Sequence, residues 1–241
     1  MVIGATTTYI WSAWVQKKFH FFMIRSNLAK LRSELHKVTS TAVELVAVSK
    51  TKPAEQVLEA YEADQRHFGE NYVSELVDKY KRLPQDINWH FIGHLQSNKV
   101  AKLLTSCPEL YMIETVDSQK LAQKINRTIS TVERRTKLKV LVEVLTSAEG
   151  TKSGVSQSEV LPLTRFITES CPNIEFDGLM TIADPSKPEN SFRILQELKI
   201  RLESESIPVR TMSMGMSGDY PIALQYGSTQ IRIGSSIFGS R

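Results

Sequence analysis

Short apolar runs, each followed by a segment with helical spacing, recur from residue 44 to residue 233. This alternation constrains the fold more than any other feature of the sequence. The runs are rich in β-branched and aromatic residues and too short for buried helices, so they are typical of strands covered on both faces. The segments between them repeat apolar residues every three or four positions, as helices with one buried face do. The expected strands are Leu45–Val48, His67–Gly69, Trp89–Gly93, Leu110–Ile113, Leu138–Leu145, Ile174–Met180, Val209–Met214 and Gln230–Ile233.

Eight strands that alternate with helices predict a single α/β domain with the (β/α)8 barrel, or TIM-barrel, fold. A further amphipathic segment, from Ile24 to Thr39, is expected to form an extra N-terminal helix that covers a flank of the barrel. A doubly wound open sheet is the alternative, but the sequence has no Gly-rich dinucleotide-binding turn. No linker rich in Pro, Gly or Ser divides the chain. We therefore expect residues 23–241 to form one domain and residues 1–22 an extension.

In a barrel of this kind the functional groups lie at the carboxyl ends of the strands. Lys50 follows the first expected strand and precedes Pro53, which suits the first turn of a helix. A lysine at a strand end is partly removed from water, which favours its neutral, nucleophilic amine and Schiff-base formation with a carbonyl compound. Lys52 is the rival amine, but it lies beyond the strand end, so Lys50 is the better placed of the two. For this segment alone, a lysine that merely reaches solvent is the alternative.

Two turns rich in small residues follow the seventh and eighth expected strands, at Met214–Gly218 and Gly234–Ser236. In this fold those turns commonly bind phosphate through backbone N–H groups and hydroxyls. Gly and Ser are common in any turn, so each turn alone indicates little. Together with a strand-end lysine, the turns favour a site for a ligand that carries phosphate.

Charge, cysteines and histidines exclude several other functions. The formal charge of +4 comes from the segment before Glu34, which holds five basic residues and no acid, so no basic stripe for nucleic acid remains. Cys107 and Cys171 lie far apart, each before a proline, which indicates loop thiols in a reducing compartment rather than a disulfide. His90 and His94 fall on an expected strand and turn rather than on one helix face, so the sequence predicts no metal site.

Residues 1–22 are rich in aromatic residues and free of acids. The segment is too short and too interrupted to span a bilayer, and it lacks the positive start of a secretory signal. Its Ser and Thr content suits a mitochondrial presequence, but no arginine precedes Arg25. We expect a cytoplasmic protein without a membrane partner, with a mitochondrial location as the alternative. No surface stripe indicates self-association, so we expect a monomer.

Six segments form a specific set when they are taken in order: Val46–Thr51, Phe68–Tyr72, Trp89–Gln96, Gly178–Thr181, Ser213–Ser217 and Arg232–Gly234. This set resembles the motifs of the pyridoxal phosphate homeostasis protein family, from about residue 24 to the C-terminus. The resemblance implies a barrel like the N-terminal domain of alanine racemase, which binds pyridoxal 5′-phosphate (PLP) as an internal aldimine. It also implies a carrier or regulator of PLP, without robust enzymatic activity, whose protein partners would be PLP-dependent apo-enzymes.

The resemblance further implies roles for single residues. Lys50 resembles the Schiff-base lysine and Arg232 the partner of the pyridine nitrogen, while Asn71 resembles a polar neighbour of the ring and Met180 a residue against the ring face. The other implied cofactor-binding residues belong to the small-residue turns and are Ser213, Met216, Ser217, Gly234 and Ser235. Structural alternatives are that Asn71 caps a helix, Met180 fills the barrel core and Arg232 pairs with a carboxylate.

The implied chemistry favours a cofactor carrier over an enzyme. Arginine is always protonated, so Arg232 would donate to the ring nitrogen and keep it neutral, which weakens PLP as an electron sink. Racemases tolerate that arrangement but need acid–base groups on both faces of the substrate, and alanine racemase takes the second base, a tyrosine, from another domain. A PLP-dependent amino-acid racemase is the main alternative. A Schiff-base aldolase and a scaffold without a ligand have less support. If the protein donates PLP, Lys152, Ser153 and Gly154 are candidates for the mouth of the site.

Overall fold

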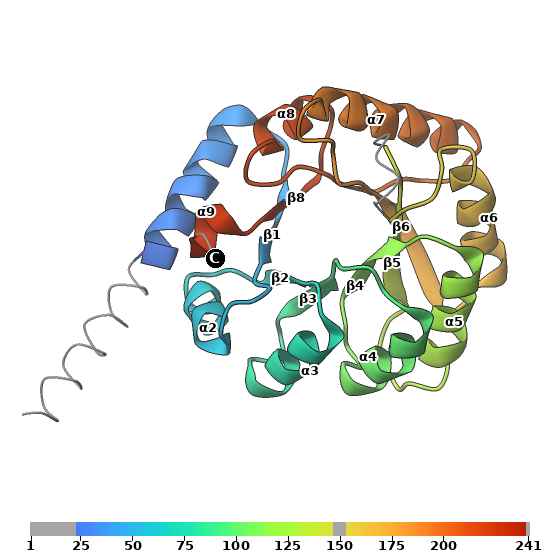
Figure 1. Cartoon of the computed structure of the whole chain (residues 1–241), viewed down its shortest axis with the longest axis horizontal. Helices are drawn as coiled ribbons and strands as arrows, with labels where there is room; N and C mark the ends of the chain where they lie inside the picture. The colour runs from blue at the N-terminus through green and yellow to red at the C-terminus, as the bar shows by residue number, and fades with distance from the viewer. Residues whose placement is uncertain (1–22, 147–152, 240–241) are drawn as a thin grey trace, which may run out of the picture.

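The structure, a computed structural model, describes residues 23–146 and 153–239. Within these residues, eight parallel strands close into a barrel surrounded by helices, so the TIM-barrel prediction is confirmed (Figure 1). The strands are β1 (Glu44–Val48), β2 (His67–Glu70), β3 (Asn88–Phe91), β4 (Met112–Val116), β5 (Leu138–Glu143), β6 (Ile174–Met180), β7 (Thr211–Ser213) and β8 (Gln230–Ile233). The helices named in Figure 1 are α2 (Ala54–Glu62), α3 (Val73–Arg82), α4 (Val100–Ser106), α5 (Gln119–Ile129), α6 (Val160–Ser170), α7 (Pro188–Ser204), α8 (Tyr220–Gln225) and α9 (Ser235–Phe238).

The barrel closes through β1 and β8, which pair in a register that sets Leu45 opposite Ile231 and Ala47 opposite Ile233. The other strands pair in sequence order, as expected when each helix returns the chain to the next parallel strand. The carboxyl ends of the strands therefore meet at one end of the barrel, which we call the top. Their amino ends meet at the other end, the bottom.

Most buried apolar side chains lie between the strands and the helices. Trp89 and Phe91 of β3 are each 1% exposed and belong to one large apolar cluster together with Leu76 of α3 and Leu103 of α4. The interior of the barrel differs. The second apolar cluster of the described chain is small and contains Met112, Leu141 and Met180. Much of the remaining interior is filled by hydrogen-bonded polar side chains, which connect the top of the barrel with its bottom.

A helix over residues 23–38 precedes β1 and lies beside α9 on the outside of the barrel (Figure 1). Asn27 Nδ2 donates a hydrogen bond of 3.0 Å to the carbonyl oxygen of Ile237 in α9. Because α9 has only four residues, the N-terminal helix covers a flank that α9 is too short to cover, as the sequence predicts. The residues that this helix buries recur at helical spacing and are Ile24, Leu28, Leu31 and Leu35.

Two strands are shorter than their apolar runs predict by at least two residues. β5 ends at Glu143, and Val144 forms only an isolated bridge with Val155. β7 is limited to three residues, Thr211–Ser213, rather than the expected Val209–Met214. Apolar runs indicate which residues are buried, and burial extends past the last hydrogen bond between neighbouring strands. The runs therefore overestimate the lengths of β5 and β7.

The predicted extension, residues 1–22, lies outside the described residues, as do the localisation predictions drawn from it. Among the helices of the described chain, none combines the length and apolar character needed to cross a bilayer.

Candidate cofactor site

A cavity of about 280 Å³ opens at the top of the barrel. Of the residues that the sequence assigns to a cofactor site, all except Ser213 line this cavity. Val48, Ile92, Ile182 and Gly218 line it as well, and the sequence analysis did not assign them a role. The complete lining is Val48, Lys50, Asn71, Ile92, Met180, Ile182, Met216, Ser217, Gly218, Arg232, Gly234 and Ser235.

Lys50 is half-buried and lies two residues past the end of β1. The backbone is held on both sides of it. The Ser49 carbonyl oxygen accepts a 2.8 Å hydrogen bond from Lys79 Nζ, and the Thr51 N–H donates to Glu75 Oε1 at 2.7 Å. Thr51 has a φ of 65°, a left-handed conformation that is uncommon for a β-branched residue. These contacts fix the place from which the Lys50 side chain enters the cavity.

The bonds that hold the Lys50 segment come from a buried ion-pair network behind it. Lys79 Nζ lies 2.6 Å from Glu70 Oε1 and 2.7 Å from Glu75 Oε1, and Ser49 Oγ also donates to Glu70 at 2.6 Å. Burial raises the pKa of Glu70 to about 7, although the Lys79 ammonium and the Ser49 hydroxyl oppose this shift. Glu70 is thus a carboxyl group whose ionisation depends on Lys79.

Lys52, the rival amine, lies elsewhere. Its Nζ donates to the carbonyl oxygens of Phe238 and Gly239 at 3.4 and 3.2 Å, and it does not line the cavity. The structure therefore places Lys50 in the cavity and directs Lys52 toward the end of α9.

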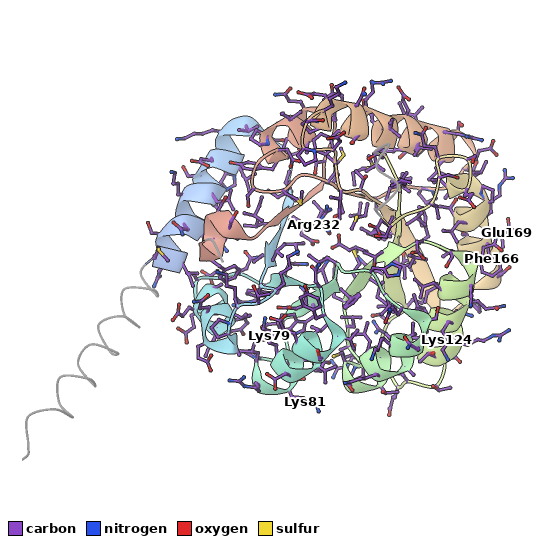
Figure 2. The ribbon with its side chains drawn as sticks, in the orientation of Figure 1. Lys79, Lys81, Lys124, Phe166, Glu169 and Arg232 are labelled. Atoms are coloured by element: carbon purple, nitrogen blue, oxygen red, sulfur yellow. The ribbon has the colours of Figure 1, made fainter. Side chains whose placement is uncertain are left out.

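Arg232 projects from β8 into the middle of the barrel (Figure 2) and is 4% exposed. Its guanidinium donates to the carbonyl oxygen of Ser213 at 2.7 Å, to Ser213 Oγ at 2.6 Å and to the carbonyl oxygen of Thr181 at 2.8 Å. A guanidinium has five N–H donors, so these three bonds leave donors for a ligand in the cavity that Arg232 lines. Burial lowers the pKa of Arg232, while the Glu114 carboxylate opposes this shift.

Ser213 lies below the cavity and supports Arg232 rather than lining the site. Its hydroxyl donates to Glu114 Oε2 at 2.6 Å, and Glu114 Oε1 accepts from Gln230 Nε2 and pairs with His90 Nδ1, both at 2.7 Å. Burial by itself would raise the pKa of Glu114, but the bonds from His90 and Ser213 and the charge of Arg232 lower it overall. Glu114 and Gln230 are not among the site residues that the sequence predicts. Their inward position could have been inferred only from strand alternation combined with the closed barrel.

Asn71 and Met180 flank the cavity from β2 and β6. The Asn71 Oδ1 atom is buried without a hydrogen-bond partner among the described residues. Such atoms are rare in proteins, so this buried acceptor of a cavity-lining residue lacks a partner that a ligand could supply. Gly93 fixes the Asn71 backbone, because a Cβ at Gly93 would lie 2.2 Å from the Asn71 carbonyl oxygen. Met180 is fully buried against Met112.

The turns after β7 and β8 form the other wall. Gly215 has a φ of 99°, which favours glycine, and Asp219 Oδ1 accepts a 2.5 Å hydrogen bond from the Met216 N–H. This bond leaves Ser217 and Gly218 at the edge of the cavity. The start of α9 faces them with Gly234 and Ser235. Backbone N–H groups at the start of a helix have no partner within the helix and suit an anion.

The suggested mouth residues are only partly described. Lys152 lies outside the described residues. Ser153 donates to Glu143 Oε1 at 2.9 Å, and neither Ser153 nor Gly154 lines the cavity.

Comparisons with known proteins agree with this geometry. Residues 22–241 match the family described as alanine racemase, N-terminal domain. The pyridoxal phosphate homeostasis protein of Homo sapiens is 48% identical over 210 residues, covering 82% of this chain and 76% of the relative. The protein of that name from Schizosaccharomyces pombe is 43% identical over 225 residues, covering 90% and 93%. A structure of PipY from Synechococcus elongatus with PLP bound has a TM-score of 0.73 at 32% identity, covering 90% of this chain and all of PipY.

Proposed function

Because this chain belongs to the pyridoxal phosphate homeostasis protein family, we propose that it binds PLP in the cavity at the top of the barrel, with Lys50 as the covalent attachment point. One observation carries the proposal. A half-buried lysine at a strand end shares a cavity of about 280 Å³ with a buried arginine and with two small-residue turns. When bound, PLP supplies an aldehyde that reacts with a lysine amine and a pyridine ring that withdraws electrons.

The residues present fit such a ligand at both of its ends. Ser217 and Ser235 offer hydroxyl groups, and Gly218 and Gly234 line the same wall without a side chain that would keep a ligand from their backbone, so this wall suits a phosphate. Asn71, whose buried side-chain oxygen has no partner among the described residues, lines the same cavity.

Arg232 supports the role of a binding protein rather than that of an enzyme. Its guanidinium is oriented by Ser213 and Thr181, and it holds its protons at all ordinary pH values. It would therefore donate a hydrogen bond to a ring nitrogen without protonating it, which leaves the ring a weak electron sink. Lys50 and Arg232 are also the only ionisable side chains among the described residues that line the cavity. This lining provides no second acid–base group of the kind that a racemase needs.

The absorbance spectrum of the purified full-length protein, before and after borohydride, tests the proposal. We expect a yellow protein whose colour is lost on reduction, and peptide mapping that finds the reduced adduct on Lys50. Lys50→Ala should stay folded and lose the covalent link, whereas Lys52→Ala, its matched control, should keep it. A colourless protein that takes up no added PLP, or an adduct on another lysine, would contradict the assignment.

A coupled assay with several L-amino acids separates the binding protein from the racemase. We expect no inversion above the background of Lys50→Ala. Inversion that depends on Lys50 would show that the protein is an enzyme.

A further inference from the structure

Three side chains that can bind metal converge at the bottom of the barrel, opposite the PLP cavity. Glu44 begins β1, His67 begins β2, and His90 lies in the middle of β3. Each offers one ligand atom, and the three atoms lie within 4.8 Å of one another. We infer that Glu44, His67 and His90 form a binding site for one divalent transition-metal ion, of which Zn²⁺ is the best match.

The distances between the ligand atoms suit a tetrahedral site. His67 Nδ1 lies 2.9 Å from His90 Nε2 and 3.2 Å from Glu44 Oε2, and His90 Nε2 lies 3.8 Å from the other oxygen of the same carboxylate, Oε1, so a rotation of the Glu44 carboxylate would choose the oxygen that binds. Ligand atoms bound about 2.0–2.1 Å from a zinc ion at tetrahedral angles are roughly 3.3 Å apart. The observed separations bracket that value, so small side-chain rotations would complete the site.

Both histidines have the outer partners that metal-binding histidines use. His90 Nδ1 lies 2.7 Å from Glu114 Oε1, the carboxylate–histidine arrangement that fixes the ring and leaves Nε2 for a metal. The other ring nitrogen of His67, Nε2, lies 3.1 Å from the Asn88 side-chain amide. When His67 binds a metal through Nδ1, its Nε2–H would donate to the amide oxygen of Asn88, which a flip of the amide supplies.

The site has an entry path and an open coordination position. The side chains of Glu44 and His67 are 30% and 21% exposed, whereas His90 is fully buried. Asn88 and Tyr111, which contact His67, also line a cavity of about 470 Å³ at this end of the barrel. None of the three ligands lines that cavity, but the partial exposure of Glu44 and His67 would let water or another small ligand reach the fourth position of a tetrahedral site.

The sequence predicts no metal site because the histidine pair that stands out along the chain is His90 and His94. The structure separates these two. His94 lies past the end of β3 at the top of the barrel, where its Nδ1 is 3.4 Å from Asp117. The actual partner of His90 comes from the neighbouring strand, where Gly69, two residues after His67, pairs with His90. Ligands from three strands leave no spacing that a motif search would detect.

Zinc competition with a chromophoric chelator tests the inference on the chelator-treated, PLP-saturated full-length protein. We expect one tightly bound Zn²⁺ per chain. Glu44→Gln and His67→Gln should each weaken binding at least as much as the roughly 10–100-fold that loss of an outer partner costs. His94→Gln, a histidine that also pairs with a carboxylate, is the matched control and should bind as the wild type does. Circular dichroism and thermal unfolding verify that each variant is folded.

Two results would overturn the inference: no stoichiometric Zn²⁺ in the wild type, or wild-type affinity in both Glu44→Gln and His67→Gln. Co²⁺ provides a second measurement that needs no variant. A visible absorption band typical of a four- or five-coordinate site with nitrogen ligands would support the inference even if both variants failed to fold. A spectrum of hydrated Co²⁺ alone would refute it.

Discussion

Replacement of Lys79 by methionine tests whether the buried network behind Lys50 depends on a single cation. Lys79 is 3% exposed and donates hydrogen bonds to Ser49, Glu70 and Glu75. Lys81, two residues further along α3, lies on the outer side of the helices that surround the barrel (Figure 2). Methionine keeps much of the length and apolar volume of lysine but removes its charge. Lys79→Met therefore leaves the Glu70 carboxylate buried without its partner.

The size of the effect follows from the burial of both partners. Removing one member of a buried ion pair costs about 3–5 kcal/mol, which corresponds to a fall in Tm of roughly 6–20 °C for a chain of this length. Lys81→Met removes an exposed charge from the same helix and should change stability by less than about 0.5 kcal/mol. The double variant Glu70→Gln/Lys79→Met removes both charges and should recover part of the loss.

The loss of stability in Lys79→Met should also depend on pH. The pKa of Glu70 is near 4.5 in the unfolded chain and about 7 in the folded protein, so the folded protein keeps the Glu70 carboxyl protonated to a higher pH. The native state thus binds more protons between these values, and the contribution of Glu70 to stability falls as pH rises through this window. At pH 5 Glu70 is already protonated, so Lys79→Met should cost less than at pH 8, where the variant must either bury an unpaired carboxylate or take up a proton to neutralise it.

Denaturant unfolding at pH 5 and pH 8 measures this effect. The reasoning is refuted if Lys79→Met is as stable as Lys81→Met at pH 8, or if it loses the same free energy at both pH values. A loss of PLP absorbance in the folded Lys79→Met variant would show in addition that the network positions Lys50, because Lys79 holds the carbonyl group of Ser49.

Three further predictions address the site and the fold. Gly93→Ala should weaken PLP retention on dialysis, because its Cβ would lie 2.2 Å from the Asn71 carbonyl oxygen; unchanged retention would show that Asn71 can move without loss. Leu28→Ala should lower the free energy of unfolding by about 2–5 kcal/mol in a denaturant titration, because Leu28 is fully buried on the inner face of the N-terminal helix; a smaller loss would mean that this helix is not part of the cooperative unit. Lys52→Met should leave the borohydride-fixed adduct on Lys50, and its disappearance would reverse the assignment of the two amines.

The fold could be predicted because its signal is local. The apolar runs and helical spacings follow from neighbours in the chain, and the carboxyl ends of parallel strands must share one end of the barrel. For that reason Lys50, Asn71, Arg232 and Gly234 could be grouped in advance, although they lie after β1, after β2, within β8 and in the turn after β8.

The parts that the sequence analysis missed depend on the interior of the closed barrel. Ser213 was grouped with the cofactor-binding residues because it precedes a small-residue turn, but it lies below the cavity and holds Arg232. No sequence spacing links His90 to Glu114, and the roles of both residues arise from contacts across the barrel. Local periodicity shows which residues a strand buries, but not which side chains from other strands they contact.

The pairing of β1 with β8 has a consequence for how the protein is made. During synthesis β1 leaves the ribosome first, and its outer edge has no partner until β8 has emerged, since chains are made from the N-terminal end. Unpaired strand edges promote aggregation, and contacts between distant segments slow folding. Lys50 and Gly234 also come together only through this last pairing, so the nascent chain has no cavity to occupy. A ligand that contacts both Lys50 and the turn at Gly234 would stabilise the closed barrel. It would bind only chains in which β1 and β8 have paired.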